Sequence, residues 1–206
     1  MELKYKSWDD ITINIYNKLK NIKLDIGDEV DMLEYNVELL SVLCDVDVQE
    51  IENLPLSEFN NLLKQSEFIS KEIKRGRTKF IYKINNKEYF FQTNPRLLTT
   101  AQFIDLQTYI KNKNEIEYIL SCCLIPNGKK YGEYNLEEVI KEIREHLSIV
   151  NALSIQFFFI QLYRKLKIAF QTSLEKQIKK LKKKNKNKEV EIILEQAMNL
   201  IQSGVG

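Results

Sequence analysis

The chain has 206 residues, of which 44% are hydrophobic, so it can bury a core as one ordinary domain or two small ones. Its 31 basic and 29 acidic residues nearly cancel, which excludes a global electrostatic attraction to DNA or anionic membranes. The three cysteines form no CxxC pair, and no apolar leader follows Met1, so we expect synthesis in a reducing, intracellular compartment.

Residues 1–74 are predicted to form an N-terminal helical domain. Ser7 and Asp10 make an imperfect capping box that would open a helix over residues 8–22. A second helix is expected over residues 28–43. It is followed by a turn at residues 48–53 and by a helix over residues 58–73, capped by Ser57.

The pattern changes to two β-rich runs in residues 79–92, separated by Asn85 and Asn86, which tolerate the left-handed conformation of a type I′ turn. A two-residue loop fixes the register and puts Lys83 opposite Glu88, a favourable pair of charges. The same register places four aromatic side chains on one face: Phe80, Tyr82, Tyr89 and Phe91. Because an isolated hairpin is marginal in water, helices or another chain must cover that face.

Helical patterns return after the hairpin. The expected helices cover residues 100–111, capped by Thr99 and Gln102, then 115–124, 136–147, opened by Asn135, and a long helix after Ser148. The stretch 147–163 is too short and too polar for a membrane span and is interpreted as a buried core helix. A lysine-rich run over 182–188 and a final helix over 189–202 complete the chain.

The predicted architecture is therefore mainly α, a multi-helix bundle with one inserted β-hairpin and a long C-terminal helix. After residues 1–74 come a hairpin-plus-helix domain, residues 75–170, and a basic helical C-terminal extension, residues 171–206. The aromatic hairpin face and the long helix, which the domain is too small to enclose, are candidate protein-contact surfaces. Their residues are Phe80, Tyr82, Tyr89, Phe91, Phe158, Tyr163, Leu166, Phe170, Leu174 and Ile178.

Positive charge is concentrated in residues 161–188, hereafter the basic segment, with eleven Lys or Arg and one acid. Its net charge of +10 leaves −8 on the rest of the chain. Three roles fit this segment: a solvated or partner-facing helix, nonspecific nucleic-acid binding, or pairing with the acidic half of the chain. Candidate contacts to nucleic acid or an acidic partner are Arg164, Lys165, Lys167, Lys179, Lys180, Lys182, Lys183 and Lys184.

No motif indicates catalysis. His146 is the one histidine, and its place near the end of a predicted helix favours a structural role. The cysteines, Cys44, Cys122 and Cys123, are expected to be small apolar packing residues. The chain lacks Walker A, dinucleotide and EF-hand patterns, so we predict no enzyme, no cofactor and no metal.

Three groups of segments form a recognisable pattern: residues 7–12 with 38–45 and 54–59, the hairpin with 100–107, and residues 120–131 running through to 154–159. Together they resemble proteins of tailed-phage morphogenesis, particularly tail-assembly-chaperone-like proteins of phages infecting Bacteroidetes, including the crAss-like group. The similarity covers roughly residues 5–165 and leaves out the C-terminal extension.

The resemblance implies a non-enzymatic protein that handles tail or neck components through protein–protein contacts. Its expected partners are other phage structural proteins or further copies of itself, with no membrane. The expected location is the host cytoplasm during assembly and, for a permanent subunit, the virion tail, neck or interior. A transient chaperone and a structural subunit both fit. The competing interpretation is a nucleic-acid-binding accessory protein that uses the basic segment.

Overall fold

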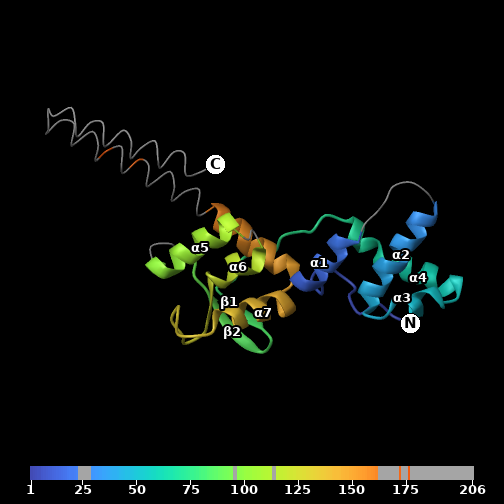
Figure 1. Ribbon diagram of the computed structural model, residues 1–206, viewed down its shortest axis with the longest axis horizontal. Coiled ribbons are helices and arrows are strands. Elements are labelled where there is room, and N and C mark those ends of the chain that lie inside the picture. The colour runs from blue at the N-terminus through green and yellow to red at the C-terminus, as the bar shows by residue number, and fades with distance from the viewer. Residues whose placement is uncertain (23–28, 95–96, 113–114, 162–171, 173–175, 177–206) are drawn as a thin grey trace. The chain divides into compact units, whose positions relative to one another are not determined.

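The computed structural model describes residues 1–22, 29–94, 97–112, 115–161, 172 and 176 (Figure 1). The protein is mainly helical, as predicted, with one small antiparallel sheet. Its labelled elements are α1 Ile13–Asn21, α2 Glu29–Cys44, α3 Val48–Glu52, α4 Leu56–Gln65, the 3-10 helix η1 Ser66–Ser70, β1 Ile81–Ile84, β2 Lys87–Phe91, α5 Thr100–Asn112, α6 Ile116–Ser121, β3 Leu124–Pro126 and α7 Leu136–His146. The described residues 149–161 are also helical.

The first helix begins later than predicted. The Ser7 hydroxyl donates to the Asp10 carboxylate at 2.9 Å, but these residues form a turn and no helix. Thr12 instead caps α1 and forms an isolated antiparallel bridge with Ser148. The bridge holds Thr12 in an extended conformation, which is why the helix cannot start before Ile13.

The third and fourth helices also differ from the predicted bounds. Residues 48–52, expected as a turn, form the short helix α3. The helix expected over 58–73 begins at Leu56, after Pro55, and ends at Gln65. Proline suits this N-terminal position because it lacks the N–H that would be left unpaired there.

The hairpin has the predicted register, with Tyr82 opposite Tyr89 and Lys83 opposite Glu88. Asn85 and Asn86 both adopt positive φ, 48° and 60°, as a type I′ turn requires. The sequence did not predict β3, which pairs with the other edge of β2 in the order β1-β2-β3. The helix expected to reach residue 124 therefore ends at Ser121.

The predicted caps of the later helices are confirmed. Thr99 and Gln102 form a reciprocal capping box, with N···O distances of 2.9 and 3.2 Å. The Asn135 side chain accepts from the first backbone N–H groups of α7, and Ser148 accepts from Asn151 at the start of the next helix. These signals depend on residues three apart, so the sequence specifies them locally.

The chain divides into two compact units, residues 1–159 and residues 160–206. The domain boundary expected at residue 74 lies inside the first unit, because backbone hydrogen bonds tie its beginning to its end. Ile13 N–H donates to Leu147 at 3.2 Å, and Ile149 N–H donates to Ile11 at 2.7 Å. One hydrophobic core includes residues from Leu3 to Phe159. The first part of the expected long helix is described, over residues 149–161, but its continuation and the extension 171–206 lie outside the described residues, apart from Thr172 and Lys176.

Candidate functional site

The aromatic face of the hairpin belongs to the core of the protein. Tyr82, Tyr89 and Phe91 are buried. Phe91 packs edge-on against Phe158, with ring centroids 5.5 Å apart, and Glu142 of α7 accepts a hydrogen bond from the Tyr89 hydroxyl. Helices of the same chain thus cover this face. The expectation that Tyr82, Tyr89 and Phe91 form a partner-binding surface is corrected.

The other predicted contact residues divide into two groups. Phe80 lies just before β1 and is 67% exposed, while Phe158 is half-buried against the core. The remaining candidates, from both the apolar and the basic sets, lie outside the described residues: Tyr163, Arg164, Lys165, Leu166, Lys167, Phe170, Leu174, Ile178, Lys179, Lys180, Lys182, Lys183 and Lys184.

The opposite face of the sheet carries an exposed apolar patch beside the charged pair Lys83 and Glu88. Ile81 and Phe90 are opposite each other in the register, and Phe90 is also opposite the half-buried Ile125 of β3. The sequence pattern placed these residues away from the aromatic face but gave no reason to expect a third apolar strand beside them.

A polar cluster fastens the hairpin to α7. Both Lys87 and Tyr89 donate to the Glu142 carboxylate. Burial of Glu142 raises its pKa, but the hydrogen bonds from Lys87 and Tyr89 outweigh this effect, so the pKa is lowered from its usual value of 4.5. The ionised carboxylate is therefore the form that the fold favours.

This cluster predicts a pH dependence of stability. Because the folded-state pKa of Glu142 is lowered, its contribution is present above about pH 4.5 and is lost as the pH falls through the folded-state pKa. We expect the variant Glu142→Gln to lose less unfolding free energy than the native protein between neutral pH and pH ~3. Urea unfolding across this range measures the difference. An equal decrease in the free energy of unfolding for both proteins over this pH range would contradict the role of Glu142.

A groove between the N-terminal helices α2, α3 and α4 is an open hollow with a largely apolar lining. Its geometry starts at the end of α2, where Asp45 adopts φ 58° and the Val46 N–H donates back to Ser41 at 3.1 Å. This left-handed helix end reverses the chain sharply, so that α3 packs against α2. Pro55 is the N-cap of α4, whose residues Leu56 and Phe59 complete the lining of the groove.

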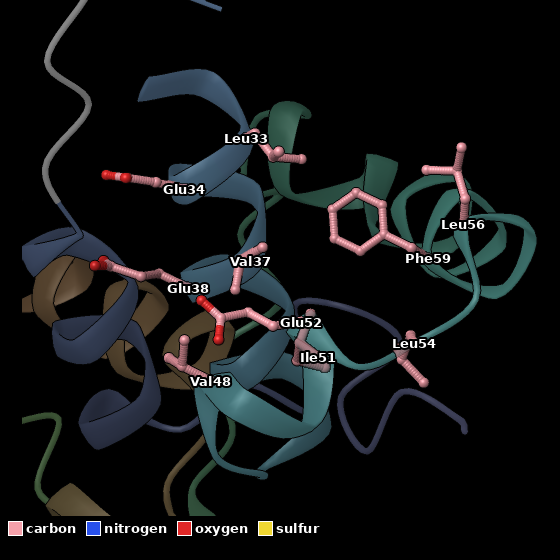
Figure 2. A pocket seen from close by; sticks show the side chains of 10 residues that line it. All are labelled: Leu33, Glu34, Val37, Glu38, Val48, Ile51, Glu52, Leu54, Leu56 and Phe59. Carbon is pink, nitrogen blue, oxygen red and sulfur yellow. The ribbon is translucent and has the colours of Figure 1, made fainter. Parts of the chain in front are cut away.

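The groove encloses about 450 Å³ and is lined by ten residues: Leu33, Glu34, Val37, Glu38, Val48, Ile51, Glu52, Leu54, Leu56 and Phe59. Figure 2 shows Phe59 pointing from α4 toward Leu33 and Val37 of α2. Leu33 and Leu56 are 53% and 72% exposed, whereas Ile51 and Phe59 form a buried floor. The groove can therefore remove large apolar side chains of a ligand from water.

All charged residues that line the groove are acidic. Glu34 and Glu38 extend from the same side of α2, and Glu52 extends from α3 (Figure 2). None of them makes an ion pair with any cation in the part of the chain that the structure describes. We call this feature, defined by the ten lining residues, the acidic groove.

The acidic groove was not predicted, although the sequence contains a signal. Residues 28–63 include ten Asp or Glu and no Lys or Arg. The helical spacing of Leu33, Val37 and Leu40 would by itself place Leu33 on the inner face of its helix. The structure leaves Leu33 exposed, whereas Leu40 and Leu43, nearer the C-terminal end of α2, are buried. Helical periodicity does not reveal this difference.

The cysteines are confirmed as buried packing residues. Burial raises the pKa of the Cys122 thiol to about 12, which keeps it protonated and a poor nucleophile at neutral pH. His146 is the last residue of α7, as predicted, beside Glu145. Among the residues that the structure describes, no group of three or more His, Cys, Asp or Glu side chains could hold a metal ion. Within the same residues, no helix has the length and apolar character that crossing a membrane requires.

Comparison with known proteins gave no matching family model, no matching curated protein and no matching solved structure.

Proposed function

We propose that this chain is a non-enzymatic assembly protein of a tailed bacteriophage and that it binds a basic, amphipathic helix of a protein partner in the acidic groove. The observation that carries the proposal is an apolar hollow with exposed leucines, flanked by three glutamates that form no ion pair with another described residue. Helices recognised in this way place an apolar stripe in the groove and charged residues at its rim.

The two kinds of contact have different energetic roles. Burial of Leu33, Val48 and Leu56 under a helix would contribute affinity, at about 25 cal/mol per Å² of apolar surface removed from water. The exposed carboxylates add little net affinity per pair, about 0–1 kcal/mol, but they accelerate encounter and exclude acidic helices. Selectivity for a basic helix therefore comes from Glu34, Glu38 and Glu52.

Binding of a synthetic helix tests this proposal. The probe is an amphipathic Leu/Lys peptide of roughly 18 residues, about five helical turns, and its matched control is a Leu/Glu peptide of the same pattern. In titration calorimetry the full-length chain is expected to bind the Leu/Lys peptide and not the Leu/Glu peptide. The combined variant Glu34→Gln, Glu38→Gln and Glu52→Gln should weaken binding by at least about threefold, because rim charges contribute modestly.

A matched variant controls for net charge. Asp9, Glu67 and Glu72 are exposed acids outside the groove, and the combined variant Asp9→Asn, Glu67→Gln and Glu72→Gln changes the charge equally. It should bind the peptide like the native chain. Equal affinity of the groove variant and this control would contradict helix binding in the acidic groove.

The phage setting is supported by the resemblance of residues 5–165 to tail-assembly-chaperone-like proteins. Mass spectrometry of purified particles and of tail-assembly intermediates tests it. Stoichiometric recovery in mature particles would favour a permanent subunit, and recovery only in intermediates would favour a transient chaperone. Absence from both would contradict the proposed setting.

The composition of the basic segment supports a second candidate function, nonspecific nucleic-acid binding. Its net charge of +10 predicts binding that weakens steeply between low and physiological salt. Its single arginine provides little capacity for base-specific contacts. No binding of an oligonucleotide at low salt would eliminate this candidate.

A further inference from the structure

We infer that the acidic groove binds the basic segment, residues 161–188, of a second copy of this chain. This inference rests on the proposed function, because it names the partner of the same groove. It makes the protein self-assembling, because each copy supplies both a groove and a basic segment to its neighbours.

Charge complementarity is the first argument. The stretch that forms the groove, residues 28–63, carries ten acids and no base, a net charge of −10. The basic segment carries eleven bases and one acid, a net charge of +10. The two segments carry opposite net charges of equal size, and these attract each other over a screening length of about 8–10 Å at physiological ionic strength. This attraction steers the two segments together.

The apolar pattern of the basic segment is the second argument. Leucine, phenylalanine and isoleucine occur in it at steps of three or four residues: Leu162, Leu166, Phe170, Leu174, Ile178 and Leu181. This spacing predicts one apolar stripe, with lysines on either side, if the segment is helical. Such a stripe, flanked by lysines, is complementary to an apolar hollow with acids at its rim. An exposed stripe of this length is stabilised when another surface removes it from water.

The direction of the chain favours the groove of a second copy over its own. The backbone N–H of Ile149 donates a hydrogen bond to Ile11, just before α1, and Phe158 packs against Phe91 of the sheet. In Figure 1 the helical residues 149–159 run from beside α1 toward α5, away from α2, α3 and α4. The basic segment follows directly after them, so reaching its own groove would require a return along the first unit. A second copy imposes no such requirement.

A groove-to-segment contact is heterologous, because the two surfaces that meet are different. Such contacts produce a closed ring when the rotation between neighbours closes and an open chain when it does not. The mass of the full-length protein should therefore rise with concentration, to that of a dimer when two copies exchange segments and beyond it when the contacts continue, and salt should reverse the rise.

Charge reversal in the full-length chain tests the inference. The groove variant carries Glu34→Lys, Glu38→Lys and Glu52→Lys, and the segment variant carries Lys179→Glu, Lys180→Glu and Lys182→Glu. The control carries Asp9→Lys, Glu67→Lys and Glu72→Lys, at exposed acids outside the groove. Sedimentation velocity should show assembly of the native chain and the control. The groove and segment variants should each assemble with a dissociation constant at least about tenfold higher, because like charges now meet. Mixing them should restore assembly, since each supplies the surface that complements the other.

The outcomes separate this inference from the proposed function. In one outcome the native chain stays monomeric while the segment variant still binds the Leu/Lys peptide through the groove. This would contradict binding to a second copy and leave the proposal of helix binding intact. Peptide binding that is stronger in the segment variant than in a monomeric native chain would assign the groove to the segment of its own chain. Assembly that survives both charge reversals would overturn the inference, and a groove that binds no peptide would overturn both proposals.

Discussion

Replacement of Phe91 by alanine is expected to lower the free energy of unfolding by about 3–5 kcal/mol, the usual cost of removing a buried aromatic ring. Phe91 is 0% exposed, packs edge-on against Tyr82 and Phe158, and lies opposite Leu124 in the sheet. The large cavity left behind would be bordered by the hairpin and the helix over residues 149–161. Urea unfolding of the full-length chain measures the change.

Phe80 is the matched control for this experiment. It is the same residue type in the same hairpin, and its carbonyl accepts from the Phe91 N–H, but its side chain is 67% exposed. Phe80→Ala should change the free energy of unfolding by no more than about 0.5 kcal/mol, as expected for a surface position. Similar losses in both variants would contradict the assignment of one aromatic face to the core.

The variant Arg144→Met is expected to destabilise the protein by about 3 kcal/mol, because it leaves a buried carboxylate without its cation. Glu117 is 2% exposed and accepts from Arg144 Nε at 2.6 Å, and Glu115 lies 3.8 Å from the same guanidinium. Methionine replaces much of the apolar stem, so that the loss of charge dominates the effect. Thermal and urea unfolding at neutral pH give the value.

A double variant checks the physical cause. Adding Glu117→Gln to Arg144→Met removes the unpaired charge and should recover part of the lost stability. A double variant less stable than Arg144→Met would mean that packing of the arginine stem, not the charge, causes the loss.

Features that depend on nearby residues were predictable from the sequence. The hairpin register follows from the two asparagines of the turn, and the caps at Thr99 and Asn135 follow from side chains three residues away. The helix start at Ile13 was not predictable, because the extended residue before it is held by a bridge to Ser148, far along the chain. β3 was missed for a similar reason, since its three residues are strand only because β2 offers a free edge.

The candidate site was missed for the same reason, because it depends on contacts between helices and not on nearby residues alone. The sequence showed the negative balance outside the basic segment but not that α2, α3 and α4 enclose a hollow. That hollow results from the left-handed residue Asp45 and from the start of α4 after Pro55, which set the angles between the three helices. The aromatic residues selected as contacts were instead those with the largest apolar surface, which is the reason that the core takes them.

Methyl NMR spectra of the full-length segment variant during titration with the Leu/Lys peptide test helix binding in the acidic groove most directly. Chemical shift changes are expected at the methyl groups of Leu33, Val37, Val48 and Leu56, with those of the core residue Ile13 unchanged. Shifts confined to Ile81 and Ile125 on the exposed face of the sheet, or no shifts at all, would contradict the account.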